Sequence, residues 1–589
     1  MRRVVCDIET NGLKPDKIWC CVCKDVDTGD ITIFRDGDAD KARKFFDGCS
    51  KIIGHNFIGY DAIWLNKLWK TGIKIDKIVD TLVLSRLAYS LRSGHSLREW
   101  GEHLGVYKDH HEDWSQWSQE MEDYCVQDVE VTVAVYHQLR KELKGIDRRA
   151  IELEHWSQAV LERQRLNGFK LDVELAMKTK AQIDAEYFDI IKQLQQLFPP
   201  RKVVVGEWVV KRNKDGNINS VSKRIIESQL VEQVEGDKYN RIEYKEFCID
   251  SPKEIVARLE GFWDPVIMTP AGQPKICEEN LNTLRPDAPP ELQLIKRCKV
   301  LKSRSTLIQS YFDACEEDGR VHGQVVSIGA GTHRMAHRNP NTGNIPSKGI
   351  YGEVCRQMFT VDKGRKLVGC DAANIQFRIL AHYLNNEELI DQIVNKDMHY
   401  YFSQMYGLNP KDKEYDPSDH DLVAGRKKGK TCTFAIIMGA GVGKIGQILG
   451  SAEKGKAAFD NLRKNIKGWN KFHKEIEYRA GVGYYIGLDG RKIPLKSAHF
   501  GMSSYLQAGE AVIMKRAMVE SFKEIKQKGL DAFQVAVVHD EMQYDCAADC
   551  AEEVGEILRR HIIEAGEYYK LRCPLDGEYV IGNNWLETH

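Results

Sequence analysis

The sequence lacks any apolar run of the roughly 18 residues that a membrane span needs. Residues 1–5 lead directly into an acidic motif, without the long apolar stretch of a secretory signal. Internal repeats and low-complexity tracts are also missing. Charged residues make up 29% and hydrophobic residues 42% of the chain, which is typical of a soluble globular protein. We therefore expect a cytoplasmic protein that does not associate with membranes.

Paired cysteines at a zinc-binding spacing are missing too, although the chain has 16 cysteines. The CxxC motif from Cys20 to Cys23 lies in an apolar, strand-like run, so reduced and buried thiols are the better interpretation. An excess of either charge is absent, because 85 basic residues face 86 acidic ones. A chain of this composition that binds nucleic acid must concentrate positive charge locally.

At 589 residues the chain is too long for one core, and about 150 residues per domain predicts three or four compact units. Residues 1–145 are expected to form one α/β unit, and long helices follow it. The strands predicted from apolar runs are residues 4–8, 19–23, 31–34 and 51–54. One predicted helix begins near Asp61. The other predicted helices cover residues 119–139, 152–166, 174–197, 252–259 and 291–312.

Residues 201–247 differ in character from the rest of the chain. Short β-like runs at residues 203–205 and 208–210 lie among dense mixed charge. The basic residues are Arg201, Lys202, Lys211, Arg212, Lys214, Lys223 and Arg224, and acids such as Glu232, Glu235 and Asp237 follow them. A solvated β-hairpin and a contact with a DNA backbone are interpretations of equal weight.

Two acids stand two residues apart at the end of the first predicted strand. Asp7 and Glu9 share one face of that strand, where a divalent cation would relieve their mutual repulsion. Asp61 follows where a strand meets a helix, and Tyr124 and Asp128 lie at i and i+4 on one helix face. Four acids and a tyrosine are typical of a two-metal phosphodiesterase. A solvated strand end is the alternative for Asp7 and Glu9 taken alone.

These residues, in this order, resemble the three motifs of the DEDD proofreading exonucleases of the tyrosine subtype. The resemblance implies a ribonuclease-H-like fold. It also implies that Asp7, Glu9, Asp61 and Asp128 bind two Mg²⁺ or Mn²⁺ ions, and that Tyr124 positions the attacking water.

A second pair of acids lies far downstream. Asp371 ends a predicted strand before a helical pattern, and Asp540 lies in a tight turn between two strand-like arms. Between them Arg426, Lys430 and Phe434 recur at i+4 on one predicted helix face. Two metal-binding acids and a cationic stripe suit a nucleoside triphosphate. Taken alone, each acid is better explained as a turn residue, and the basic segment as a solvated turn beside a buried phenylalanine.

Together these segments resemble motifs A, B and C of the family A DNA polymerases, the DNA polymerase I family. Residues 332–334 and 339–346 resemble the TGR…PNLQNIP segment of the family, and residues 397–399 resemble its segment with a triphosphate-contacting histidine. The match is best with the replicative polymerases of short-tailed bacteriophages. It covers almost the whole chain, apart from about residues 200–247.

The family resemblance implies a role for each matching residue. Asp371 and Asp540, with the carbonyl of Ala372, would hold two Mg²⁺ ions, and Lys430 would act as a general acid toward pyrophosphate. The residues implied to contact the nucleotide are Arg426, Lys430, Phe434, His399 and Gln376, and those implied to contact DNA are Arg334 and Gln507.

Three positions depart from the family pattern. Gln376 stands where motif A has a glutamate that screens the sugar 2′ position. Met438 stands where motif B has a tyrosine before its final glycine, and Phe434 replaces the tyrosine that is usual in the phage branch. The metal ligands are unchanged, so activity is expected. Sugar selection and fidelity are the properties that these departures concern.

The expected fold class is α/β and α+β multidomain, with a ribonuclease-H-like exonuclease domain followed by a right-hand polymerase domain. The exonuclease domain would cover residues 1–145. Linker helices and the thumb would cover residues 146–330, with an insertion at about 200–247. The palm and fingers would cover residues 331–589, with the fingers at about 385–480.

The expected function is template-directed DNA synthesis from dNTPs with 3′→5′ proofreading, in the replication of a phage genome inside a host cell. In the phage branch a thumb insertion recruits host thioredoxin, so thioredoxin and a helicase–primase are candidate partners beside primer–template DNA and dNTPs. The alternatives are a stand-alone 3′→5′ exonuclease with a non-synthesising DNA-binding half, a non-catalytic scaffold, and a single-subunit RNA polymerase. Intact acids at both sites disfavour all three.

Overall fold

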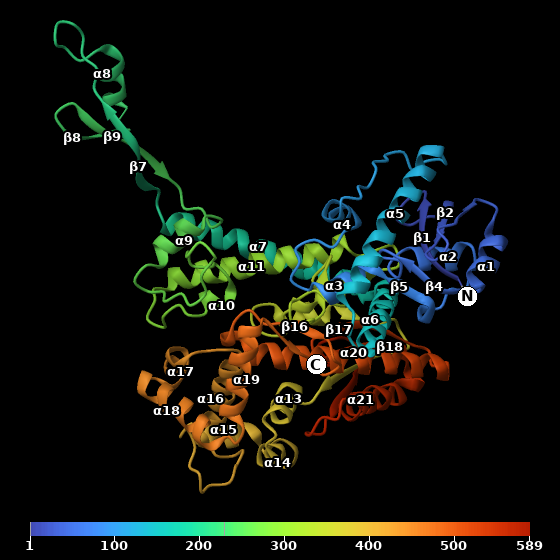
Figure 1. The fold of residues 1–589 in the computed structure, drawn as a ribbon. Helices are drawn as coiled ribbons and strands as arrows, with labels where there is room; N and C mark the ends of the chain where they lie inside the picture. The colour runs from blue at the N-terminus through green and yellow to red at the C-terminus, as the bar shows by residue number, and fades with distance from the viewer. Residues whose placement is uncertain (1, 229) are drawn as a thin grey trace. The chain divides into compact units, whose positions relative to one another are not determined.

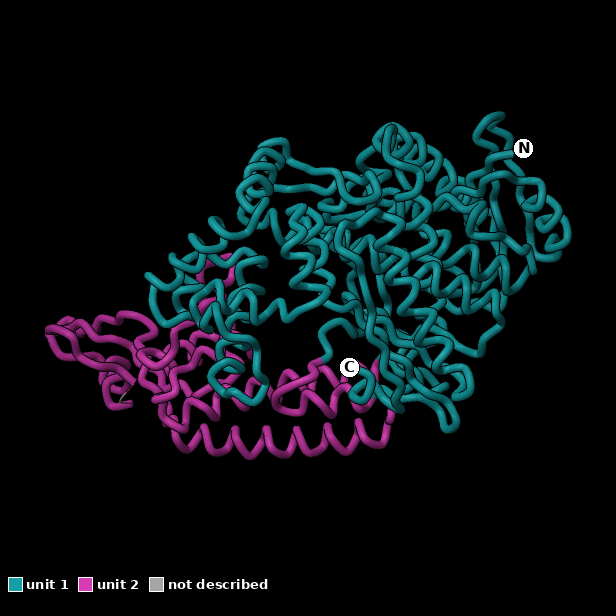
Figure 2. Tube along the Cα trace, turned by 90° about the horizontal axis from the view of Figure 1, so that it is seen from below, with its two compact units in different colours: residues 1–170, 314–345, 359–589 teal, residues 171–313, 346–358 magenta. Residues whose placement is uncertain are grey.

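A computed structural model describes residues 2–228 and 230–589, and Figure 1 shows the order of its helices and strands. The chain forms two compact units (Figure 2). The first contains residues 1–170, 314–345 and 359–589, and the second contains residues 171–313 and 346–358. None of the described helices combines the length and the apolar character that a membrane span requires.

The N-terminal part of the first unit is a five-stranded mixed sheet in the order β3-β2-β1-β4-β5. The strands are β1 (Arg2–Thr10), β2 (Ile18–Asp25), β3 (Ile31–Arg35), β4 (Cys49–Gly54) and β5 (Ile78–Asp80). The first three strands pair antiparallel, whereas β4 and β5 run parallel to β1. The helices around it are α1 (Ala39–Asp47), α2 (Asp61–Leu68), α3 (Thr81–Ala88), α4 (Leu97–Leu104) and α5 (Gln119–Glu142). This is the strand order of a ribonuclease-H-like fold, as predicted.

Alternating residues of this sheet bury both of its faces. On β1, Val4 and Cys6 pack into one apolar cluster and Val5 packs into another. On β2, Cys20 and Cys23 likewise belong to different clusters, because residues three apart on a strand point to opposite faces. The two cysteines of the CxxC motif therefore cannot share a metal ion, which agrees with the prediction of buried thiols.

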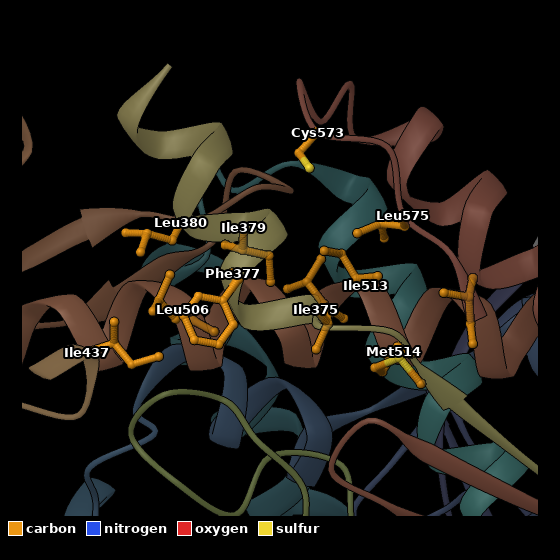
Figure 3. Packing of buried hydrophobic residues seen from close by; sticks show 14 of the residues in the cluster. Ile375, Phe377, Ile379, Leu380, Ile437, Leu506, Ile513, Met514, Cys573 and Leu575 are labelled. Atoms are coloured by element: carbon orange, nitrogen blue, oxygen red, sulfur yellow. The ribbon is translucent and has the colours of Figure 1, made fainter. Parts of the chain in front are cut away.

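A second sheet of the first unit is antiparallel, in the order β17-β18-β14-β19. Its strands are β14 (Arg365–Ala372), β17 (Ala532–Val538), β18 (Glu541–Ala547) and β19 (Gly577–Gly582). Helix α21 (Ala551–Tyr568) packs against β14 and β19, α20 (Gly501–Lys528) contacts β17, and α13 (Ile375–Leu384) packs against α20. Figure 3 shows Ile375, Phe377 and Ile379 of α13 in one buried cluster with Leu506 and Ile513 of α20. Each fully buried side chain of this size contributes about 1.5–3 kcal/mol.

Six helices lie between α13 and α20 in the chain. They are α14 (Glu387–Asn395), α15 (Met398–Met405), α16 (His420–Ile437), α17 (Val442–Leu449), α18 (Ala452–Asn465) and α19 (Trp469–Val482). Asp397 caps α15 and Asp419 caps α16, since each carboxylate accepts hydrogen bonds from backbone N–H groups of the first turn. After α16, Gly439 has φ +93°, a conformation that glycine adopts without strain.

The second unit is built on two long helices. These are α7 (Val173–Leu197), which stops before Pro199 and Pro200, and α11 (Pro290–Asp313), which packs against α7. The shorter α9 (Pro252–Leu259) also contacts α11.

Residues 201–245 form an arm beyond α7 within the second unit (Figure 1). Its elements are β7 (Arg201–Val209), α8 (Ser220–Glu227), β8 (Val231–Glu235) and β9 (Lys238–Lys245), with sheet order β7-β9-β8. The two predicted β-runs are thus one strand with an irregularity between Val204 and Gly206. Instead of a simple hairpin the arm is a three-stranded sheet with a helix, which the charged sequence did not predict.

A buried charge network joins distant segments of the first unit. Glu154 on α6 (Arg148–Asn167) accepts hydrogen bonds from Lys515 of α20, at 2.7 Å, and from Arg491, at 2.5 Å. Arg491 also binds Asp489, and Lys515 donates to the backbone oxygen of His333 at 2.9 Å. The side chains of Glu154, Arg491 and Lys515 have no exposed surface. Buried charges of this kind are tolerated only when they are paired and hydrogen-bonded.

Two candidate active sites

The first candidate site lies at the end of β1. Asp7 and Glu9 follow one another on one side of this strand, and single ligand atoms of Asp7, Glu9 and Cys125 all lie within 4.8 Å of one another. Asp61, the first residue of α2, reaches the same place, because its Oδ1 accepts a hydrogen bond from the backbone N–H of Ile8 at 3.2 Å. The structure therefore brings Asp61 to the pair of acids on β1, although more than 50 residues separate it from them in the sequence.

The position of Asp61 depends on the turn that precedes α2. Asp80, only 1% exposed, accepts hydrogen bonds from the backbone N–H groups of Asn56 and Ile58, at 3.1 and 2.9 Å. The same carboxylate caps α3 through Leu82 at 2.9 Å. Asp80 thus connects β5 to the turn before α2. Its role in the structure is to fix the backbone that leads to Asp61.

The remaining predicted residues of this site come from α5. Tyr124 and Asp128 lie one turn apart, and Asp128 is 3% exposed. Lys108, from the segment before α5, pairs with Asp128 through its ammonium group, which lies 4.7 Å from the centre of the Tyr124 ring. The second carboxylate oxygen of Asp128 is buried and has no partner among the described residues. All five residues predicted for this site are therefore in one cluster, and Lys108 joins them.

Burial and mutual repulsion raise the pKa of each acid in this cluster. Desolvation, then repulsion from Asp128, raises the pKa of Asp7 to about 7. Desolvation, then repulsion from Asp7, raises the pKa of Glu9 to about 10 and also raises that of Asp61. Desolvation and repulsion make the charged forms of these acids unfavourable, and one oxygen of Asp128 has no partner among the described residues. A hard divalent cation would offset both, because it binds carboxylate oxygens. The residues present therefore fit the metal ions that the family resemblance implies.

The second candidate site lies on the antiparallel sheet. Asp371 is near the end of β14, where it pairs in register with Glu541 of β18. Asp540 lies in the turn between β17 and β18, and its backbone oxygen accepts a hydrogen bond from the N–H of Ala372 at 3.0 Å. In this turn His539 has φ 55°. The sheet thus places the two acids next to each other although 168 residues separate them in the sequence.

The two acids of the second site also repel each other. Asp371 stays exposed to solvent, yet desolvation and then the nearby Asp540 raise its pKa to about 8. Desolvation and then Glu510 raise the pKa of Asp540 to about 6. Such a pair favours a bound cation, so the donor set here fits a divalent metal as well.

A cationic and aromatic stripe runs along α16, as predicted. Lys430 lies 5.9 Å from the centre of the Phe434 ring, and this ring packs edge-on against Phe377 with 5.0 Å between ring centres. Arg426 donates to Asp397 at 2.7 Å. His399 of α15 lies 6.1 Å from Phe434, and its pKa falls to about 4 because of burial, then Lys430 and Arg426. These side chains form one positively charged group suited to phosphates.

The other predicted contacts lie on neighbouring elements. Gln376 at the start of α13 and Arg334 both contact Glu510 of α20, at 2.7 and 2.6 Å. Gln507, one turn earlier on α20, donates to the sulfur of Met438 at 3.8 Å. Arg334 and Gln376 thus both meet α20 at Glu510, and Gln507 lies about one turn away on the same helix.

Three further residues of these sites were not predicted. Lys108 and Trp114 come from the irregular segment before α5, and Trp114 lies 5.6 Å from the Tyr124 ring. Glu510 is an acid in the apolar middle of a helix. Of the three, Glu510 alone could have been found from the sequence, because a charged residue among alanine and valine is unusual in a buried helix.

Known proteins resemble this chain in sequence. A sequence model described as DNA polymerase family A matches residues 219–587. The DNA-directed DNA polymerase of Enterobacteria phage T3 is 28% identical, and that of Escherichia phage T7 is 27% identical, each over 100% of both chains. DNA polymerase I of Pseudomonas aeruginosa is 28% identical over 64% of this chain and 42% of its own.

A solved structure supports the same fold. The POL domain of Pol1 from M. smegmatis, in complex with a DNA primer-template and dNTP, superposes with a TM-score of 0.77 at 18% identity. The superposition covers 99% of this chain and 95% of the other. Since the family model spans more than half of the sequence, the resemblance seen in the motifs is confirmed, and the chain belongs to the family A DNA polymerases.

Proposed function

We propose that this chain is a replicative DNA-directed DNA polymerase that also removes nucleotides from primer 3′ ends. Synthesis would take place at Asp371 and Asp540, and 3′→5′ hydrolysis at the cluster around Asp7. The observation that supports this most is the presence of two separate clusters of acids, each with its own accessory residues, in a chain of this family.

At the polymerase site the acids would hold the metal ions. Asp371, Asp540 and the carbonyl of Ala372 would bind Mg²⁺, which supplies a lowered pKa at the primer 3′-OH and neutralises triphosphate charge. Arg426 and Lys430 would bind the phosphates from one face of α16 and stabilise the charge that develops on them. Lys430 would donate the proton that the leaving pyrophosphate takes up.

Two neutral side chains would shape the same site. His399 is uncharged near pH 7, so its buried ring can donate a hydrogen bond to a phosphate oxygen without adding a third cation. Phe434 would pack against the base and sugar, since Phe377 holds its ring edge-on.

At the exonuclease site Asp7, Glu9, Asp61 and Asp128 would hold Mg²⁺ or Mn²⁺, which supplies an activated water and charge neutralisation at the scissile phosphate. Tyr124 would orient that water through its hydroxyl group. Lys108 lies between Asp128 and Tyr124 and would keep the tyrosine ring in place.

We assign these activities to the domains that the sequence predicts. Exonuclease would belong to residues 1–145, the thumb with its arm to residues 146–330, and the palm and fingers to residues 331–589. The enzyme would act in the cytoplasm of a phage-infected host cell. A helicase–primase partner rests on the resemblance alone.

A stand-alone exonuclease is the competing function, and the family match over residues 219–587 disfavours it. A primer-extension assay with dNTPs or NTPs, with and without Mg²⁺, separates the candidates. Template-dependent extension with dNTPs and Mg²⁺ supports the proposal. Shortening of the primer without any extension would favour the exonuclease, and extension with NTPs would favour an RNA polymerase.

Phe434 leads to a prediction about chain terminators. Family members with tyrosine at this position use the phenol oxygen to help accept a substrate that lacks a 3′-OH, and Phe434 has no such oxygen. We expect the unmodified enzyme to discriminate strongly against ddNTPs. In Phe434→Tyr this discrimination should fall at least about tenfold, which corresponds to the free energy of one hydrogen bond. The measurement is the ratio of ddNTP to dNTP incorporation on one template. Phe45→Tyr on α1 is the control, and equal use of both substrates by the unmodified enzyme would contradict the prediction.

The arm is proposed to increase processivity. Of its seven early basic residues, three are ion-paired: Arg201 with Glu254, Lys202 with Glu232 and Arg212 with Asp237. The other four, which form no ion pair with any described residue, are Lys211, Lys214, Lys223 and Arg224. These four cations would lie along the DNA backbone. Val209, Val221 and Val234 have exposed apolar side chains, and a partner such as host thioredoxin would bind there.

Deleting residues 202–245, with a short Gly/Ser bridge, should spare single-nucleotide addition but shorten the product made in one binding event. The log–log salt slope of DNA binding should flatten by about one unit for each lost phosphate contact, and so by up to about four. Trapped primer extension at several salt concentrations, with and without thioredoxin, measures both effects. Replacing the four cations by glutamine keeps the sheet and is the matched control. Unchanged product length and slope after the deletion would assign the arm no role in DNA binding.

A further inference from the structure

Glu510 is a carboxylate in the buried middle of α20, with 1% of its surface exposed. Ala508 and Ala511 beside it are also buried. A carboxylate in such surroundings costs several kcal/mol unless it is paired and hydrogen-bonded. Its position in the helix interior therefore requires an explanation from its partners.

Both oxygens of Glu510 are engaged, each by a different segment of the first unit. The guanidinium of Arg334 donates to Oε1 at 2.6 Å, and the amide of Gln376 donates to Oε2 at 2.7 Å. Arg334 comes from the loop before β12 (Ala336–Arg338), and Gln376 from the first turn of α13. One carboxylate thus holds together two side chains that are 42 residues apart in the sequence.

Each of these two partners keeps one buried polar atom free. The amide oxygen Oε1 of Gln376 and the Nε of Arg334 have no hydrogen-bond partner among the described residues. A buried polar atom without a partner is unfavourable, and a bound ligand can supply what is missing. Glu510 therefore fixes one end of each side chain and leaves an acceptor on Gln376 and a donor on Arg334 for a substrate.

The place of this contact relates it to the reaction. The carboxylate of Glu510 binds Gln376, which lies five residues after Asp371, in the first turn of the helix that follows β14. The oxygens of Glu510 are already used by Arg334 and Gln376. Glu510 is thus placed to position other side chains at this site.

The residue type at position 376 matters for this pairing. Gln376 replaces the glutamate of motif A, and its amide can donate a hydrogen bond to Glu510 where a glutamate could only accept. A glutamate there would face the carboxylate of Glu510 at hydrogen-bond distance, and two like charges so close repel strongly. Gln376 and Glu510 are therefore complementary, with the negative charge of the pair on α20 instead of α13.

We propose that Glu510 is a positioning residue for substrate selection, which orients Gln376 against the sugar of the incoming nucleotide and Arg334 against the primer terminus. This inference rests on the proposed polymerase function. When Glu510 is lost, Gln376 gains rotational freedom and the space beside the sugar 2′ position opens. Discrimination between dNTPs and rNTPs is then weaker.

The test is a double-mutant cycle read out by single-nucleotide incorporation of a dNTP and its matching rNTP. Glu510→Ala should lower discrimination against the rNTP about tenfold, the value of a hydrogen bond to a charged group. Gln376→Glu, which places two carboxylates together, should lower dNTP incorporation at least about tenfold. Gln376→Glu combined with Glu510→Gln restores a matched pair and should return dNTP incorporation to within about threefold of the unmodified enzyme.

Glu520→Ala, which removes a half-buried acid further along α20 that pairs with Lys523, is the control for loss of charge on this helix. Thermal unfolding of every variant shows whether the fold is intact. Strictly additive effects of Gln376→Glu and Glu510→Gln would overturn the inference. So would a loss of all incorporation in Glu510→Ala as deep as in Asp371→Ala, since Glu510 would then belong to the metal site. If Asp371→Ala kept normal synthesis, the proposed function itself would fail, whatever the cycle showed.

Discussion

Asp371→Ala is expected to abolish primer extension, by at least about a thousandfold, and to leave degradation of primer 3′ ends at its normal rate. Asp540→Ala should do the same. The reason is the geometry of the antiparallel sheet, where both acids lie side by side and repel each other without a bound cation. Neither acid contributes to the cluster around Asp7.

The converse variant is Asp7→Ala combined with Glu9→Ala. It should remove 3′→5′ degradation to a similar extent while extension survives, because the ligand atoms of these two acids lie together at the end of β1. Product length and primer shortening are measured on one labelled primer–template, with dNTPs present or absent. Removal of divalent cations by a chelator should stop both reactions.

Two exposed acids serve as controls for these substitutions. The first control is Asp549→Ala, and Asp549 lies just after β18. The second is Asp27→Ala, and Asp27 lies just after β2, where it pairs with Arg3 at the surface. Both should leave the two activities unchanged. If either active-site substitution removed both activities while the thermal unfolding curve stayed normal, the assignment of two independent sites would be wrong.

Glu154→Ala is expected to destabilise the protein by about 3–5 kcal/mol, the cost of leaving a buried charge unpaired. Glu154 is the shared acceptor for Arg491 and Lys515, and all three side chains are inaccessible to water. Desolvation already lowers the pKa of Lys515 to about 8, although Glu154 pulls it upward. Without Glu154 the two cations would face each other in the interior.

The loss is best measured by denaturant unfolding with a probe in the first unit, since a chain with two units need not unfold in one step. Glu152→Ala on the same helix is the matched control. Glu152 pairs with Arg148 at 2.6 Å, but both side chains are exposed, so this substitution should cost less than about 1 kcal/mol. Equal effects of the two substitutions would show that burial of the network contributes nothing to stability.

Much of the fold follows from local pattern. The strands around Asp7 and before Asp371 and the helix that carries Tyr124 fall where apolar spacing predicts them. Turn chemistry also places Asp540 between two strands. The acids of each site could be grouped because chain order and the family resemblance supplied the long-range information that spacing lacks.

Other features depend on tertiary contacts that no local pattern records. Lys108 precedes α5 in an irregular segment, so nothing in its neighbourhood indicates that its ammonium group meets Asp128. Helix α8 is short and Ser222 is its one buried residue, so neither its length nor a buried apolar face predicts it. The pairing of Gln376 with Glu510 joins α13 to α20 and is visible only in space.

The order of strands in the antiparallel sheet β17-β18-β14-β19 has a consequence for protein synthesis. Strand β14 carries Asp371 at the centre of that sheet, but its neighbours β18 and β19 begin at Glu541 and Gly577. A ribosome working at 5–20 residues per second needs on the order of ten to thirty seconds to reach β18 after β14 is made. During that interval the apolar strand has no partner, and exposed strands of this kind invite aggregation. Nascent chains of this polymerase should therefore depend on chaperones until translation is almost complete.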